Sequence, residues 1–240
     1  MAIPFEASSR SVPFTAPLLL NQTRATFEDF PDRRKTKTSN NLKYAVADAA
    51  MSAFSVFFTQ SPSFLDYQER MRKKHGKCNA QSILGVPKLP SMNQVRNLLD
   101  PVSPTARYPL FQEINDELYH NGYLDSYRSL NGSLLLAIDA TDCFSSEEIS
   151  YPGCTQQTLK NGQTLYRHIA VTPVIVAPGK SDVIPLPPEF VEPQDGHEKP
   201  DCELAAAKRW LTAWGALFAL EYHDFGRRLI LSPTLLRSRY

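Results

Sequence analysis

The sequence contains no uninterrupted apolar run that is long enough to cross a bilayer. Its best candidate, residues 45–58, is interrupted by Asp48 and by two serines. The three leucines at positions 18–20 are too short a run for a signal peptide. Neither sign of charge dominates, because 26 Lys and Arg stand against 25 Asp and Glu, which leaves a net charge of +1. The composition therefore predicts no membrane association and gives no overall signal for nucleic acid.

Cysteine and glycine are also sparse. The four cysteines (Cys78, Cys143, Cys154 and Cys202) are scattered, and no pair has zinc-knuckle spacing, so the pattern fits a reducing cytoplasm better than a disulfide framework. The chain has 19 prolines and only 10 glycines, which predicts many rigid loops. Neither a Gly-rich phosphate loop nor a G-x-S-x-G elbow is present, and no local motif supports Cys202 as a nucleophile.

Short helices joined by Pro-rich loops are predicted for the first half of the chain. Residues 1–26 have small, polar and proline residues without a sustained period, so we expect a flexible arm. Residues 27–130 form the expected helical region, in which apolar residues recur at steps of three and four. The predicted helices cover residues 42–58, 64–74, 92–99 and 110–121.

Two basic clusters lie in this helical region. The first contains Arg33, Arg34, Lys35 and Lys37, and the second contains Arg70, Arg72, Lys73 and Lys74. Lys and Arg supply most of the non-specific affinity of proteins for DNA, so both clusters are candidate phosphate contacts. A solvated loop explains the first cluster equally simply, and compensation of a helix dipole in the last turn explains the second.

The pattern changes to extended segments at Ser133. An apolar strand is expected at residues 133–139, an irregular stretch at 143–160, a largely β-branched strand at 165–177, and a proline-broken edge strand at 183–190. A turn at 178–182 fits a hairpin, and a helix is expected from about 200 to 219. The fold class predicted from this order is α+β, with about three strands and one helix in the second half.

Asp139 is the candidate site residue with the clearest context, because it closes the apolar strand. A carboxylate at the end of a buried strand is costly unless it is paired, hydrogen-bonded or bound to a metal. The alternative is a surface carboxylate in a turn, because Asp-Ala-Thr-Asp is also good turn chemistry. Asp142 is expected either to share a metal or to be solvated, and His168 to be a hydrogen-bonded histidine on a strand face. His197 and His223 have no convincing zinc spacing with Cys202.

Several sequence blocks resemble the DDE-type transposases of bacterial insertion sequences, whose catalytic core has an RNase H-like fold. The likeness runs from about residue 27 to residue 220. The blocks are Asp29-Phe-Pro-Asp-Arg-Arg34 with Tyr44 to Phe58, then Leu135 to Ser146, then Leu186-Pro-Pro-Glu-Phe190 with Gln194-Asp-Gly-His-Glu-Lys199, Asp201-Cys-Glu203 and Ala206 to Leu211. The chain departs from the family pattern at Ala140, where Gly is common, and at Tyr151, where a Cys often precedes Cys154.

The resemblance implies that Asp139 is the first catalytic carboxylate and a metal ligand. In the family, a second Asp lies on a strand after the helix, and a Glu lies much further on. These carboxylates hold two divalent ions, Mg²⁺ or Mn²⁺, that activate water or a 3′-hydroxyl and stabilise the leaving oxygen. The resemblance also implies that the short helices bind double-stranded DNA at the ends of the element.

The resemblance stops at about Leu220, and the last twenty residues do not fit. Moving the reading frame by one nucleotide lets the codons of residues 222–225 encode Ile-Thr-Ile-Leu, and those that follow Gly226 encode Asp-Asp, as the family expects. Residues 131–220 are therefore expected to be the first part of an RNase H-like core and 221–240 an out-of-frame tail. The alternatives are programmed frameshifting and a natural C-terminal strand at 229–231.

These expectations describe a transposase that is catalytically incomplete. The chain alone is expected to bind no metal tightly and to cleave no DNA. A competing hypothesis is a non-catalytic DNA-binding regulator that occupies the element ends or joins full-length transposase in inactive complexes. A third is a pseudogene product without function, for which an exposed half-core predicts poor solubility.

Overall fold

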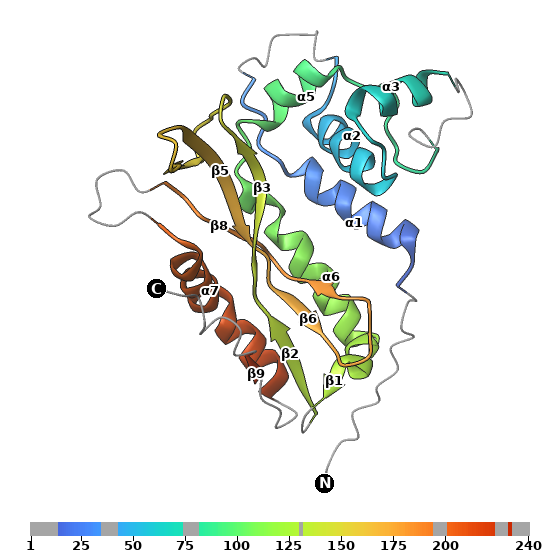
Figure 1. The fold of residues 1–240 in the computed structure, drawn as a ribbon. Coiled ribbons are helices and arrows are strands. Elements are labelled where there is room, and N and C mark those ends of the chain that lie inside the picture. The colour runs from blue at the N-terminus through green and yellow to red at the C-terminus, as the bar shows by residue number, and fades with distance from the viewer. Residues whose placement is uncertain are drawn as a thin grey trace. The chain divides into compact units, whose positions relative to one another are not determined.

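The computed structural model describes residues 14–34, 43–73, 82–129, 132–193, 201–223 and 230–231, with side chains up to residue 215 except that of Arg72. Contacts divide the chain into two compact units, residues 1–117 and 118–240. Helices build the first unit and mainly antiparallel strands the second (Figure 1). The predicted α+β fold class is therefore confirmed. No helix within the described ranges is long and apolar enough to cross a membrane.

Four of the helices lie at the positions expected from the sequence. They are α2 (Val46–Phe58), α3 (Phe64–Arg72), α5 (Met92–Leu99) and α6 (Tyr108–His120), with a 3-10 turn, η1 (Pro104–Arg107), before α6. Side chains of Ser63 and Ser91 cap α3 and α5 by accepting backbone N–H groups in the first turn. These caps satisfy backbone N–H groups that would otherwise lack a partner in the first turn of each helix.

An additional helix, α1 (Ala16–Glu28), covers residues 16–26 of the segment for which a flexible arm was expected. The arm prediction is wrong from Ala16 onward, and residues 1–13 lie outside the described part. Thr15 caps the helix and Pro17 stands in its first turn, where a proline is tolerated because the N–H it lacks would be unpaired. The buried side chains of α1 include Leu20 and Phe27, which pack against α2.

Arg24 of α1 joins three parts of the first unit. Its guanidinium lies 3.2 Å from the Asp48 carboxylate of α2 and donates to the Gly85 carbonyl oxygen at 2.9 Å. Gly85 has φ +63°, and a Cβ there would lie 3.2 Å from Arg24 Nη1. A glycine is required at this position both by the backbone conformation and by the close approach of the arginine.

The described residues of the second unit form nine short strands. They are β1 (Arg128–Ser129), β2 (Ser133–Ala137), β3 (Ala140–Ser146), β4 (Thr155–Thr158), β5 (Thr164–Val171), β6 (Val174–Val176), β7 (Ile184–Pro185), β8 (Glu189–Phe190) and β9 (Ile230–Leu231), with the 3-10 turn η2 (Tyr123–Tyr127) before β1. The helix α7 (Glu203–His223) comes between β8 and β9.

These strands form two sheets that share continuous stretches of chain. In one sheet β2 pairs with β1, β6 and β9, and β7 pairs with β6 at the edge. All these pairs are antiparallel except β2 with β9, which is parallel. In the other sheet β5 is central, flanked by β3 and β4, and β8 also pairs with β5. The ribbon of β2 and β6 continues into β3 and β5 (Figure 1).

Residues 143–160 are not irregular throughout, as the sequence suggested. They contain most of β3 and all of β4, which are largely solvent-exposed strands. Their side chains are mainly polar on both faces, so the alternation that reveals a half-buried strand is absent. The predicted edge strand at 183–190 is split into β7 and β8, with prolines at 187 and 188 between them.

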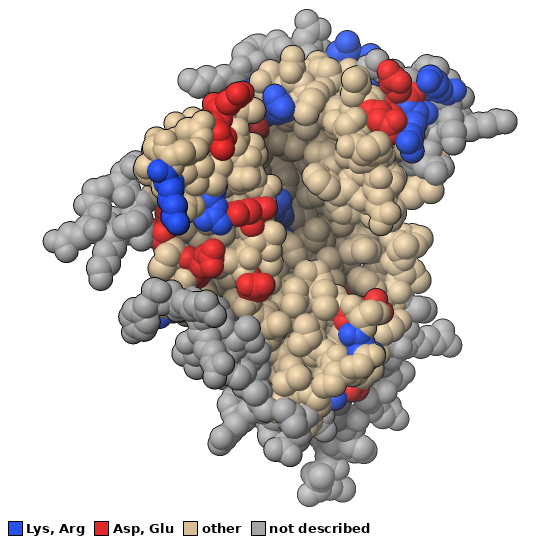
Figure 2. Space-filling model, in the orientation of Figure 1, with Lys and Arg blue, Asp and Glu red and all other residues tan. Residues whose placement is uncertain are grey.

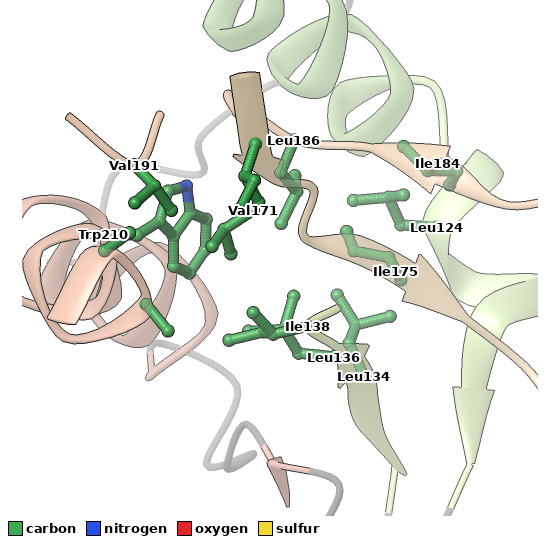
Figure 3. Close-up of a cluster of buried hydrophobic side chains, with 13 residues drawn as sticks. Leu124, Leu134, Leu136, Ile138, Val171, Ile175, Ile184, Leu186, Val191 and Trp210 are labelled. Carbon is green, nitrogen blue, oxygen red and sulfur yellow. The ribbon is translucent and has the colours of Figure 1, made fainter. Parts of the chain in front are cut away.

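The core of the second unit is built around Trp210 of α7. The Trp210 side chain is fully buried, and its Nε1–H donates to the Pro187 carbonyl oxygen at 2.6 Å. Apolar side chains of β2, β5, β6 and the segments beside β7 and β8 belong to the same cluster (Figure 3). Burial of one face of β2 fixes the register of this strand in its sheet. The register in turn fixes the position at which β2 ends.

An ion-pair network fixes the start of α7. The Asp201 carboxylate has no exposed surface, and the Arg209 guanidinium donates two hydrogen bonds of 2.9 Å to it. Arg209 also donates to Glu189 and to the Phe190 carbonyl oxygen of β8. Backbone N–H groups of Glu192 and Cys202 complete the hydrogen bonding of Asp201. The network thereby ties β8 to the first turns of α7.

Candidate functional site

Asp139 lies where the chain leaves one sheet and enters the other. The last pair of β2 with β6 is Ala137 with Val174, and the first pair of β3 with β5 is Ala140 with Val171. Across this gap the Thr172 N–H donates to the Asp139 carbonyl oxygen at 2.8 Å, and the Thr172 hydroxyl lies 3.4 Å from the same oxygen. The backbone at Asp139 is therefore fixed although it belongs to neither strand.

The Asp139 side chain is exposed to solvent. Its Oδ1 accepts the Ala140 N–H at 2.9 Å, which is a local bond within the bend. This is the arrangement expected of a surface carboxylate in a turn, and it avoids the desolvation cost of a buried charge. Exposure at a fixed backbone position is also compatible with binding a cation, so the assignment of Asp139 as a metal ligand stays a prediction.

β9 lies beside the strand that leads to Asp139. Ile230 and Leu231 pair in parallel with Leu135 and Leu136 of β2. Parallel neighbours point their C-terminal ends to the same edge of a sheet, so β9 ends at the edge at which β2 leads to Asp139. The sequence from residue 225 to 240 contains neither Asp nor Glu.

Asp142 does not act with Asp139 in this structure. Its carboxylate accepts hydrogen bonds from Arg167 Nε at 3.0 Å and from Nη2 at 2.7 Å. The hydrogen bond to Asp142 raises the pKa of Arg167, despite partial burial of the guanidinium. Of the two readings left open from the sequence, a shared metal and a solvated carboxylate, the structure agrees with the second, because Asp142 is exposed and pairs with Arg167 on the surface of β3 and β5.

Among the described residues, no three His, Cys, Asp or Glu side chains lie close enough together to hold a metal ion. His197 lies in residues 194–200, which are outside the described ranges. The side chain of His223 is also outside the described part. Cys202 is exposed beside the buried Asp201. Fitting Mg²⁺ or Mn²⁺ to the described residues therefore gives one carboxylate ligand, Asp139, and no complete site.

His168 is a hydrogen-bonded histidine on the face of β5, as predicted. Its Nδ1 lies 2.7 Å from the Tyr151 hydroxyl, and its ring contacts those of Tyr151 and Phe190. Burial lowers the pKa of His168. Burial, together with the neighbouring Cys154 and Cys143, raises the pKa of Tyr151 to about 12. Sequence reasoning missed Tyr151 as the partner, because the two residues are 17 positions apart.

The first basic cluster is only partly available to a ligand. Arg34 donates to the Asp32 carboxylate at 2.8 Å and to the Tyr44 carbonyl oxygen at 2.9 Å. Hydrogen bonding with Arg34 lowers the pKa of Asp32, and the same bond raises that of Arg34. Arg34 thus holds its own loop, whereas Arg33 is exposed. Lys35 and Lys37 lie outside the described residues.

The second basic cluster lies at the end of α3. Arg70 is 62% exposed and lies 2.8 Å from Asp66 one turn earlier, and Lys73 is exposed at the C-terminal cap. The side chain of Arg72 and all of Lys74 are outside the described part. On the face drawn in Figure 2, basic and acidic side chains are interspersed, without a large patch of one sign.

Comparisons with protein-family models, with curated proteins and with solved structures found no match for this chain.

Proposed function

We propose that this chain is the first part of a DDE-type transposase of a bacterial insertion sequence, with Asp139 as the first of its catalytic carboxylates. The observation that carries the proposal is the position of Asp139. It follows β2, is exposed, and lies at the sheet edge toward which the parallel strand β9 also points. The resemblance implies a first carboxylate after the first core strand and a second on a strand after the helix. The order of β2, with Asp139 after it, and then α7 agrees with the part of this implication that precedes the tail.

The chain by itself supplies too few ligands for metal-dependent cleavage. When bound, a pair of Mg²⁺ or Mn²⁺ ions supplies charge stabilisation and an activated nucleophile in the full-length family. Asp139 would be one of the residues that hold these ions, but it belongs to no group of three or more possible ligands among the described residues. We therefore propose that the 240-residue chain binds neither ion tightly and does not cut or join DNA.

The proposed reading of the tail is that residues after about Leu220 are translated out of frame. α7 continues to His223, and Ile230 with Leu231 form β9. Both reading frames predict a strand after the helix, because the tail of this chain also contains an apolar triplet. The presence of β9 therefore favours neither reading frame. The coding DNA decides between them: the account requires Gly-Asp-Asp in the neighbouring frame after the Leu220 codon.

A second candidate function is a non-catalytic DNA-binding regulator. The observation that favours it is the helical first unit with exposed Arg33, Arg70 and Lys73, in a chain that lacks a complete metal site in its described part. Such a regulator would bind element ends, or full-length transposase on them, in the cytoplasm. Gel-shift assays with duplex DNA at several salt concentrations test it, because phosphate contacts make the affinity fall steeply with salt. A chain without function would show no such binding and would be poorly soluble.

A further inference from the structure

We infer that α2, the turn after it and α3 form a helix-turn-helix-type reader of duplex DNA, with the outer face of α3 in the major groove. The inference rests on the proposed function, because it names the part of the first unit that reads the DNA. In such motifs a short turn joins two helices, and residues of the second helix contact base edges. Here residues 59–63 join the end of α2 to the start of α3.

The turn has a fixed conformation. Gln60 has φ +50°, in the left-handed region that helix-ending turns use. The Ser61 N–H donates to the Val56 carbonyl oxygen at 2.9 Å, and the Thr59 hydroxyl donates to the Ser55 carbonyl oxygen at 2.7 Å. Of the described residues other than glycine, Gln60 alone has a positive φ. The direction in which the chain enters α3 is therefore determined by the turn.

Buried polar contacts determine which face of α3 points inward. The Tyr67 side chain is fully buried, and its hydroxyl accepts a hydrogen bond of 2.7 Å from the Ser55 hydroxyl of α2. Gln68 is 5% exposed, and its amide donates to the Pro90 carbonyl oxygen just before α5. Two consecutive anchored side chains leave little freedom for rotation of the helix, so the opposite face is presented in one orientation.

The outer face of α3 has the chemistry of a major-groove reader. Leu65, in the first turn, is 65% exposed, and Glu69 follows it one turn later on the same face. An apolar side chain suits the thymine methyl group, and a carboxylate accepts from the cytosine amino group. Arg70 and Lys73 lie beside this stripe and suit phosphates or guanine. Arg70 is 62% exposed and its partner Asp66 is 34% exposed, so the guanidinium is accessible to a phosphate on its solvent side.

The test uses the full 240-residue chain and a library of duplexes with a random 20-base-pair centre, about two helical turns. Bound duplexes are selected and sequenced, and affinities for the selected sequence are then measured by fluorescence anisotropy at several salt concentrations. The variants are Leu65→Ala and Glu69→Gln for base reading, and Arg70→Gln and Lys73→Gln for phosphate contacts. Lys88→Gln is the matched control, because Lys88 is an exposed cation of the same unit outside both helices.

We expect the wild-type chain to select a sequence. Leu65→Ala and Glu69→Gln should each relax discrimination at one base pair by about 5- to 100-fold. Arg70→Gln and Lys73→Gln should weaken binding to all duplexes and each lower the salt slope by about one, whereas Lys88→Gln should change nothing. If the wild-type chain binds no duplex even at low salt, the proposed function fails. If it binds, but the α3 variants behave like Lys88→Gln, DNA binding stands and the assignment of α3 is overturned.

Discussion

Arg209→Met tests the network that fixes the start of α7. The substitution keeps much of the aliphatic volume but removes the guanidinium from Asp201, whose side chain has no exposed surface. Breaking a fully buried ion pair costs about 3–5 kcal/mol, because the remaining charge is buried without a partner. Arg209 itself is 40% exposed, so water reaches the vacated position and reduces the loss. We expect the free energy of unfolding to fall by about 2–3 kcal/mol at pH 7.

The same network predicts a pH dependence. Burial alone raises the pKa of Asp201, but the hydrogen bonds from Arg209 and from the backbone N–H groups of Glu192 and Cys202 lower it below 3.8 overall. A carboxylate with a lowered pKa in the folded state stabilises the protein above its unfolded pKa. That stabilisation is lost as the pH falls through the folded pKa. Wild-type stability should therefore decline below about pH 4, and Asp201→Asn should flatten that decline.

Urea denaturation followed by tryptophan fluorescence measures both effects, since the two tryptophans, Trp210 and Trp214, both lie in α7. Arg167→Met is the matched control, because it removes the same bidentate contact from Asp142 where both side chains are partly exposed. That variant should lose less than about 1 kcal/mol. Equal losses for Arg209→Met and Arg167→Met would refute the reasoning that burial of Asp201 sets the magnitude.

Two further substitutions test the packing, and one tests the site. Trp210→Ala should destabilise the second unit by about 3–5 kcal/mol in urea denaturation followed by circular dichroism, and a loss below about 1 kcal/mol would contradict its place in the core. Gly85→Ala should lower the free energy of unfolding by about 1 kcal/mol more than Gly162→Ala does. The reason is that, of these two positions, only at Gly85 does the new Cβ lie within 3.4 Å of another side chain. Thermal denaturation of the two variants measures the difference. Asp139→Asn should leave the melting temperature unchanged, because the carboxylate is exposed, and a large shift would show a structural role instead.

The sequence predicted those elements whose signals are local. Helix α3 was found because its apolar residues recur at helical steps, and α5 because Ser91 marks its start. β2 was found as an apolar run that ends close to Asp139. α1 was missed although Thr15 and Pro17 mark its start, because its polar and small residues hide the period. β3 and β4 were missed because exposed strands do not alternate between apolar and polar residues.

The contacts of the candidate site residues were mostly beyond prediction, because they join distant positions. Asp142 was considered as a metal ligand, but it pairs with Arg167, which is 25 residues away and on another strand. Arg34 was grouped with neighbouring cations, but it is bound to Asp32 and to the Tyr44 carbonyl oxygen. A run of like charges in a sequence does not reveal which members are already used in the fold.

Strand cleavage by the protein read in the neighbouring frame after the Leu220 codon tests the central claim most directly. The restored protein is incubated with duplex DNA from the ends of the element and Mg²⁺, beside its Asp139→Asn variant and the 240-residue chain. The account predicts cleavage by the restored protein, a loss of at least about 10³-fold with Asp139→Asn, and no cleavage by the 240-residue chain. Undiminished cleavage by the Asp139→Asn variant would contradict the assignment of Asp139 as the first metal ligand.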